Sequence, residues 1–172
     1  MVLPEGFSYA TTNDVEELVT LVNSAYRGEE AKNGWTTEAD LIEGIRIDTN
    51  SLLKLINKPG ATFIKYETDG KIIGCVYLQK LENVLYLGML TVDPNLQAKG
   101  IGKKLLRLSE AFATEEQLTH IIMNVISVRK ELIAWYERQG YYQSDERKPV
   151  PADPRFGIPR RPLEFIIMKK DL

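Results

Sequence analysis

The sequence predicts a single α/β domain around a mixed sheet, spanning residues 1–172. Two observations support this prediction. Apolar residues recur at helical spacing in the first third of the chain, whereas strand-like apolar runs separated by turn signals dominate from Ala61 onward. No internal repeat, low-complexity tract or linker divides the chain, and its length is ordinary for one hydrophobic core.

The chain is expected to begin with a short strand, Phe7–Ala10, followed by an amphipathic helix. Asn13, with Glu16 three residues later, forms a capping-box pattern at the start of that helix. The helical pattern breaks at Gly28. The inward residues of the helix are Val15, Leu18, Val19, Val22 and Tyr26.

A second helix is expected after the polar segment 28–37, with Thr36 or Thr37 as its N-cap. A brief helical segment, Leu52–Ile56, follows and ends at Lys58-Pro59-Gly60. The inward residues of the second helix are Leu41, Ile42 and Ile45.

Three strands are then expected to form an antiparallel meander. Asp69-Gly70 is a hairpin turn signal between the first two, and Glu82-Asn83 forms a polar turn between the second and third. The strands are Thr62–Glu67, Ile72–Leu81 and Val84–Val92.

The last part of the chain alternates helices and strands. Gly140 stands at the C′ position expected after a helix, and five prolines between positions 149 and 162 argue against regular structure in a long basic loop. The expected elements are a helix from about Gly102 to Glu115 with Leu105, Leu106, Leu108 and Phe112 inward, a strand Ile121–Ile126, a helix Arg129–Gln139, a strand Tyr141–Ser144 and a final strand Leu163–Lys169.

Composition excludes several classes of function. The net charge of −2 argues against broad binding to nucleic acid or to an anionic membrane. No apolar stretch is long enough to span a bilayer, and the N-terminus lacks the features of a signal peptide, so a cytoplasmic location is expected. The single histidine, His120, and the single cysteine, Cys75, are too few for a His/Cys metal site, so no metal is expected.

The stretch Leu85–Leu106 contains the strongest functional signal. A strand is followed by a sharp stop at Asp93-Pro94-Asn95, by glycines at 100 and 102, and by the start of a helix. This order builds a nest of backbone N–H groups suited to phosphate or pyrophosphate. A Walker A loop would need glycine at 97 and serine or threonine at 104, and a dinucleotide fingerprint would need a small residue at 105. Those positions hold Gln97, Lys104 and Leu105.

The segment Gln97-Ala98-Lys99-Gly100-Ile101-Gly102 resembles the Q/R-x-x-G-x-G/A loop of the GNAT superfamily of acyl-CoA-dependent N-acetyltransferases. Downstream, Ile121–Val125 looks like the fifth strand of that family, and Trp135–Tyr141 is similar to its F-Y-E-K-x-G-F segment. The resemblance implies a mostly antiparallel twisted sheet of about seven strands, flanked by about four helices. The resemblance further implies that the fourth and fifth strands run parallel and splay apart.

The resemblance also implies acetyl-CoA as co-substrate, with no metal. The strand backbone would pair with the pantetheine arm, N–H groups of the glycine loop would hold the pyrophosphate, and Tyr136 would act as general acid toward the CoA thiolate. Basic residues at 99, 103, 104 and 107 would pair with CoA phosphates or form a solvated helix face. The implied cofactor-binding residues are Leu90, Thr91, Val92, Gln97, Ala98, Lys99, Gly100, Ile101, Gly102, Lys103, Arg129 and Tyr136.

Two positions depart from the family pattern. Many relatives carry a glutamate on the fourth strand where this chain has Gly88, so the usual strand-borne base is missing. Many also carry an asparagine where this chain has Arg129, which could reach a cofactor phosphate or a substrate carboxylate. Other candidates for a base are Glu29, Glu30, Glu38 and Glu82, each of which could also be a surface residue.

The acceptor site is expected between Gly28–Asp40 and the proline-rich loop Lys148–Pro162. Trp35 could line it or pack in the core. The arginines at 155, 160 and 161 could favour an anionic acceptor or simply form a solvated loop.

The preferred hypothesis is direct transfer of acetyl from acetyl-CoA to a primary amine within a ternary complex. The acceptor would be a small molecule or a peptide, and a homodimer is left open. One alternative is a non-catalytic acyl-CoA-binding or regulatory module, suggested by Gly88. Another is an acyltransferase with a different acyl donor or a hydroxyl acceptor.

Overall fold

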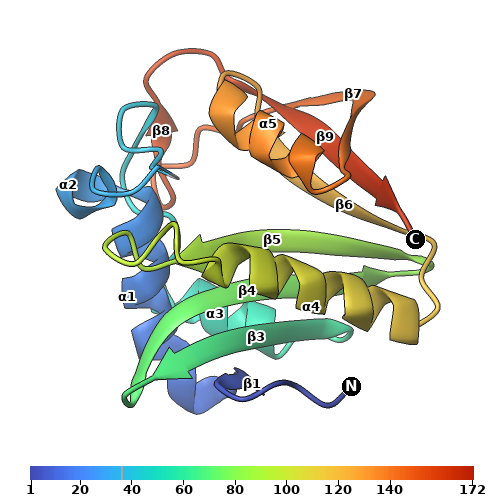
Figure 1. The fold of residues 1–172 in the computed structure, drawn as a ribbon. Coiled ribbons are helices and arrows are strands. Elements are labelled where there is room, and N and C mark those ends of the chain that lie inside the picture. The colour runs from blue at the N-terminus through green and yellow to red at the C-terminus, as the bar shows by residue number, and fades with distance from the viewer. Residues whose placement is uncertain (36) are drawn as a thin grey trace.

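The structure, a computed structural model, describes residues 1–35 and 37–172. Across these residues seven strands form one sheet in the order β1-β3-β4-β5-β6-β9-β7, in which only β5 and β6 pair in parallel (Figure 1). The predicted mixed sheet with a parallel central pair is therefore confirmed. The strands are β1 Phe7–Tyr9, β3 Ala61–Thr68, β4 Lys71–Leu81, β5 Val84–Val92, β6 His120–Ile126, β7 Tyr142–Pro149 and β9 Glu164–Asp171.

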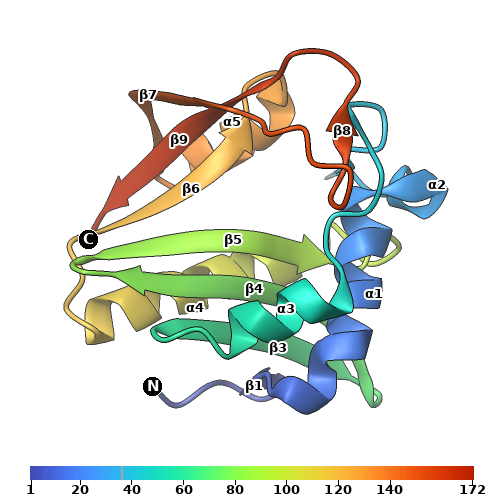
Figure 2. The same cartoon turned by 180° about the vertical axis from the view of Figure 1, so that it is seen from behind.

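Helices cover both faces of the sheet. Helices α4, Ile101–Glu115, and α5, Lys130–Arg138, lie on one face, and α1, Val15–Tyr26, and α3, Thr49–Ile56, lie on the other (Figures 1 and 2). Each face has its own cluster of buried apolar side chains, as the helical periodicity predicts. No helix within residues 1–35 or 37–172 is long and apolar enough to cross a membrane.

Strands β5 and β6 diverge after a short contact. Their parallel pairing joins Val84–Tyr86 to residues 120–122 and then stops, although both strands continue. In Figure 1 they form a wedge that opens toward α1 and the loops. Beyond this contact no strand pairing joins the facing edges of β5 and β6.

A bulge in β5 changes which way its side chains point. Gly88 pairs with Tyr77 and Thr91 pairs with Cys75, so two residues of β5 oppose the single residue between them on β4. Met89 has a φ of 46° at this point. Leu85 and Leu87 pack in the cluster on the α4 side, Met89 packs in the cluster on the α1 side, and Leu90 and Val92 face the α4 side again. The bulge therefore reverses the alternation of side chains along β5.

The start of α1 differs from its prediction. Thr11, rather than Asn13, forms the capping box: its hydroxyl accepts from the Asn13 N–H at 3.3 Å, and the Asp14 carboxylate accepts from the Thr11 N–H at 2.8 Å. This box caps a 3₁₀ turn, Thr12–Asp14, that leads into α1. Lys65 adds an ion pair to Asp14 at 2.8 Å, so a contact distant in sequence favours the earlier cap.

The prediction of a second helix after the segment 28–37 is wrong. The short helix α2, Gly28–Ala31, comes earlier, and residues 37–47 form an irregular segment with the two-residue strand β2, Ile42–Glu43. Thr36 lies outside the described residues, and Ile45 is exposed rather than inward. The Asn23 side-chain oxygen accepts from the backbone N–H groups of Arg46 and Ile47 at 2.7 and 3.2 Å, and these tertiary hydrogen bonds replace those of a helix.

The proline-rich loop is irregular as predicted, apart from an isolated antiparallel bridge between Asp153 and Gly157 and one short strand. Its two-residue strand β8, Ile158–Pro159, is antiparallel to β2. The preceding strand β7 is also longer than expected, because its register shift between Gln143 and Arg147 allows pairing with β9 to continue to Pro149. Loops far apart in sequence therefore meet beside the open end of the wedge (Figure 2).

Candidate functional site

Two cavities meet between the splayed strands. The glycine-loop cavity, of about 350 Å³, lies against residues 97, 98 and 100–103 and against Trp35. The arginine cavity, of about 310 Å³, contains the side chains of Arg27, Arg46 and Arg129. Their shared wall consists of Tyr26, Leu90, Leu132 and Tyr136. Two molecules bound in these cavities would therefore meet at this wall.

The glycine loop has the backbone geometry of an anion nest. Gly100 is the N-cap of α4 with a φ of 78°, and no side chain caps this end of the helix. The first N–H groups of a helix have no partner within the helix and carry partial positive charge. A Cβ at Gly102 would lie 3.6 Å from Val92, while none of the neighbouring atoms lies within 4 Å of one at Gly100. The loop can therefore approach a phosphate group closely through its backbone.

Gln97 ties this loop to its surroundings. Its amide nitrogen donates to the Val92 carbonyl at 3.1 Å, and its oxygen accepts from the Trp35 N–H at 2.9 Å. The Trp35 ring lies 5.8 Å from that of Trp135 on α5. Trp35, expected to line an acceptor pocket or to pack in the core, instead lines the glycine-loop cavity.

Tyr136 lies where the two cavities meet. Its ring packs against Trp135 and Tyr141 at centroid distances of 5.0 and 5.8 Å. Burial, followed by the neighbouring Tyr26, raises the pKa of its hydroxyl above the usual range, while the charge of Arg129 opposes the shift. Within the described part of the chain its hydroxyl has no hydrogen-bond partner. The hydroxyl is therefore protonated near neutral pH and can donate a hydrogen bond into either cavity.

Tyr26 occupies the opposite side of the shared wall. Its hydroxyl donates to the Leu90 carbonyl at 2.5 Å, next to the bulge of β5. Burial and the nearby Glu38 charge raise the pKa of Tyr26 to about 12, so it remains a donor. This bond fixes the β5 backbone where the strand leaves the sheet contact with β6.

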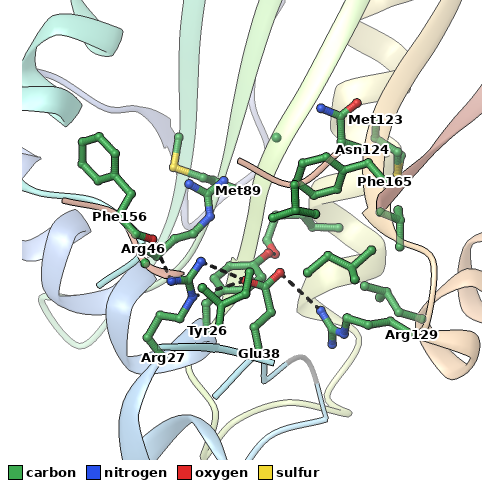
Figure 3. Close-up of a pocket in the computed structure, with 18 of the residues that line it drawn as sticks. Tyr26, Arg27, Glu38, Arg46, Met89, Met123, Asn124, Arg129, Phe156 and Phe165 are labelled. Carbon is green, nitrogen blue, oxygen red and sulfur yellow. Dashed lines mark hydrogen bonds and ion pairs between the residues drawn. The ribbon is translucent and has the colours of Figure 1, made fainter. Parts of the chain in front are cut away.

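A buried ion cluster lies at the C-terminal end of α1, on the wall of the arginine cavity (Figure 3). The Arg27 guanidinium pairs with Glu38 at 3.3 Å and also donates to the carbonyls of Ile45 and Phe156 at 3.1 and 2.8 Å. Arg129 lies 3.8 Å from the other oxygen of Glu38. The Glu38 side chain is only 12% exposed, whereas the alternative bases Glu29, Glu30 and Glu82 are exposed. Glu38 is thus the single candidate among the four that reaches a cavity.

The space beside Gly88 is filled by an aromatic ring. A Cβ at position 88 would lie 3.0 Å from the Tyr86 ring and 3.3 Å from its hydroxyl oxygen. Both residues lie on the same side of β5 and line the arginine cavity. A tyrosine hydroxyl therefore occupies the region that a longer side chain at Gly88 would enter.

Nine of the twelve residues assigned to the cofactor come together in the glycine-loop cavity: Leu90, Val92, Gln97, Ala98, Gly100, Ile101, Gly102, Lys103 and Tyr136. Three lie elsewhere. The Thr91 side chain is buried and donates to the Met89 carbonyl at 2.9 Å, Lys99 is exposed, and Arg129 lines the arginine cavity and donates to the Trp35 carbonyl at 3.2 Å. Contact with a cofactor stays a prediction for all twelve residues.

The expected acceptor segments both reach the arginine cavity, through Glu38 on one side and through Pro151, Asp153 and Phe156 on the other. The exposed arginines at 155, 160 and 161 do not line it. Sequence reasoning missed Tyr26, Leu132, Arg46 and Tyr86. The helical spacing of α1 predicts Tyr26 to be an inward-facing core residue, and Arg46 lies in the segment expected to be helical.

Comparison with known proteins gives one family match. The sequence model described as "Acetyltransferase (GNAT) family" matches residues 15–141, which include β5, the glycine loop and α5. A curated relative, N-acetyltransferase 8B from Homo sapiens, is 24% identical over 67% of this chain and 53% of its own length. The chain thus spans about half the length of this relative.

Solved structures share the fold over nearly the whole chain. Ribosomal-protein-alanine N-acetyltransferase from Brucella melitensis is 21% identical with a TM-score of 0.70, covering 96% of this chain and 99% of that one. The PaiA N-acetyltransferase from Thermoplasma acidophilum, solved in complex with coenzyme A, is 20% identical with a TM-score of 0.70, covering 96% of this chain and 98% of that one. The expected architecture is therefore found in proteins of this type.

Proposed function

The chain belongs to the acetyltransferase (GNAT) family, and from this premise we propose that it transfers acetyl from acetyl-CoA to a primary amine of a small molecule or peptide. The observation that supports this proposal best is the meeting of two cavities at Tyr136 and Leu90. One cavity has the backbone nest of a phosphate site, and the other has polar groups at its walls. Such an arrangement suits direct transfer between two ligands bound together.

The glycine-loop cavity fits the donor. N–H groups from Ala98 to Lys103 would hold the pyrophosphate, and the β5 backbone at Leu90 and Val92, which does not pair with β6, would hold the pantetheine arm. The PaiA relative, with its bound coenzyme A, supports this use of the fold.

Acetyl-CoA supplies the acyl group as a thioester, whose carbonyl carbon forms a C–N bond with the amine while the C–S bond breaks. The amine must be neutral to attack, and it loses one proton to solvent as the sulfur gains one. Tyr136 faces both cavities and would donate its hydrogen bond to the sulfur as negative charge develops there. Its raised pKa favours hydrogen-bond donation over complete proton transfer.

Glu38 is better suited to positioning than to general base catalysis. Both of its oxygens face guanidinium groups, at 3.3 Å for Arg27 and 3.8 Å for Arg129. Protonation would leave two buried cations without their counter-charge, which is costly. We therefore propose that the amine proton leaves through water in the arginine cavity.

Release of free CoA tests the proposed function. Purified protein is incubated with acetyl-CoA and a panel of primary amines, the released thiol is titrated, and acetylated products are identified by mass spectrometry. Burial raises the pKa of the Cys75 thiol to about 12, so the protein itself contributes little to the signal. Amine-dependent release is expected. Binding without release would favour a non-catalytic acyl-CoA-binding module, and release only with alcohols or other acyl donors would favour the third hypothesis.

Replacing Gly100 with valine is expected to raise the Kd for acetyl-CoA at least tenfold, measured by isothermal titration calorimetry. A β-branched residue is strained at a φ of 78°, and its side chain would occupy the surface offered to phosphate. Gly70→Val is a matched control: Gly70 has a φ of 72° in a hairpin turn, and neither glycine has atoms within 4 Å of an added Cβ. Both variants should lose roughly 1–2 kcal/mol of stability. Equal affinity of the two for acetyl-CoA would contradict the assignment of the loop.

A further inference from the structure

The charges that line the arginine cavity do not balance. Three arginines face two carboxylates, those of Glu38 and Asp153. Glu38 pairs with Arg27 and Arg129, and Asp153 pairs with Arg155, which lies outside the cavity, at 2.9 Å. Both carboxylates are therefore already neutralised by other groups. Glu38 offsets only one of the three cavity arginines, so the lining keeps a net positive charge, and Arg46 is the one of the three that faces neither carboxylate.

The Arg46 guanidinium has no anionic partner and no side-chain hydrogen bond within residues 1–35 and 37–172. In Figure 3 dashed lines join Glu38 to Arg27 and to Arg129, but none reaches Arg46. Its backbone is nonetheless held in place, since its N–H donates to the Asn23 side chain at 2.7 Å. The cation is thus anchored at the cavity wall and available to a bound ligand.

A second donor lies close to Arg46. Tyr86 faces the same cavity from β5, and its hydroxyl likewise has no hydrogen-bond partner within the described part of the chain. Burial raises the pKa of Tyr86, and the charge of Arg46 opposes this rise, as it also does at Tyr26. A guanidinium and a phenolic hydroxyl together form a donor pair suited to a carboxylate.

The size of the cavity limits what can carry that carboxylate. A volume of about 310 Å³ is at the small end of ligand pockets. Strands β2 and β8 pair beside it, and the Arg27 guanidinium fastens residues 45 and 156 together. Apolar side chains, among them Met89, Met123 and Phe165, line other parts of the cavity, together with the Asn124 amide. A small molecule that carries an amine, a carboxylate and an apolar side chain close together would match this lining.

We propose that the acceptor is a free amino acid or a close analogue, whose carboxylate is bound by Arg46 and the Tyr86 hydroxyl while its amine faces the shared wall at Tyr136. This inference rests on the proposed function and adds a substrate class to it. The anionic subsite uses Arg46, in place of the exposed arginines of the proline-rich loop.

Matched acceptors test the subsite directly. L-Methionine and L-methioninamide have the same side chain and nearly the same size, but only the acid carries a carboxylate. We expect Arg46→Met to lower the acid-to-amide ratio of kcat/KM by about 10- to 100-fold, as expected for one charge-assisted pair. Comparing the ratio between wild type and variant cancels the difference in amine pKa between the two compounds. Arg46→Lys should restore part of the ratio, and Tyr86→Phe should lower it by about 3- to 10-fold.

A binding measurement makes the test independent of turnover. Calorimetry with CoA present would compare N-acetyl-L-methionine with N-acetyl-L-methioninamide, and only the acid should lose affinity in Arg46→Met. Arg161→Met is the control, because Arg161 is exposed and does not line the cavity; it should leave the ratio unchanged.

The outcomes separate this inference from the proposed function. Absence of CoA release with every amine would overturn the function, and the subsite would then be judged on binding alone. If Arg46→Met lowers kcat/KM, or the binding affinity, by the same factor for the acid and for the amide, only the carboxylate subsite is overturned. Faster turnover of methionyl-alaninamide than of methionine would also overturn it, in favour of a peptide amine.

Discussion

Replacing Arg27 with methionine should lower the free energy of unfolding by about 3–5 kcal/mol. Arg27 is 8% exposed, although its guanidinium is charged, and burial lowers its pKa while Glu38 opposes that shift. The substitution would remove the ion pair and leave the carbonyls of Ile45 and Phe156 without their donor. Methionine fills similar space, so lost packing would be small.

Urea denaturation followed by tryptophan fluorescence measures this effect. Two controls accompany it. Arg155→Met removes an exposed ion pair and should change stability by less than about 1 kcal/mol. Glu38→Gln keeps the shape of the side chain but removes its charge, so it isolates the electrostatic contribution of this ion pair to the free energy of unfolding. A loss below about 1 kcal/mol for Arg27→Met would show that the cluster does not stabilise the loops.

Replacing Tyr136 with phenylalanine should lower kcat by about 100-fold or more, with little change in the Kd for acetyl-CoA. The ring contacts with Trp135 and Tyr141 do not use the hydroxyl, so packing is preserved. The lost group is the hydroxyl at the wall shared by the two cavities. Because its hydrogen bond strengthens as charge develops on sulfur, its removal affects turnover more than binding.

The control for this substitution is Tyr142→Phe, which removes a hydroxyl from a tyrosine that is 45% exposed on β7. It should retain wild-type kcat. Both rates are obtained from CoA release with the best acceptor in the panel, and the Kd from calorimetry. Unchanged kcat in Tyr136→Phe would remove this residue from the proposed mechanism.

The elements that could be predicted from the sequence are those specified by local patterns. The meander has its turn signal at Asp69-Gly70, and α1 and α4 have continuous apolar spacing. The glycine loop could be identified because its chemistry depends on backbone freedom at fixed positions, such as Gly100. These features require no knowledge of what packs against them.

The structure around the arginine cavity could not be predicted from the sequence, because contacts between residues far apart in the chain determine it. Residues 37–47 have helical spacing of apolar residues, yet Asn23 and Arg27 bind their backbone groups from another element. The bulge at Met89 leaves no local sequence signal, although it decides which side chains of β5 face each cavity. Glu38 was one of four candidates for a base, and only its burial beside Arg27 separates it from the others.

The short contact between β5 and β6 has a mechanical consequence. Only residues 84–86 are paired with residues 120–122, so three residues of each strand provide all the pairing between the two parts of the sheet. A change in the angle between them would break no other hydrogen bond between β5 and β6. Side-chain packing and the bonds made by Arg27 would resist it, and packing is non-directional. The width of the gap that receives both ligands is therefore set by side-chain packing and by the bonds of Arg27, not by the hydrogen bonds of the sheet.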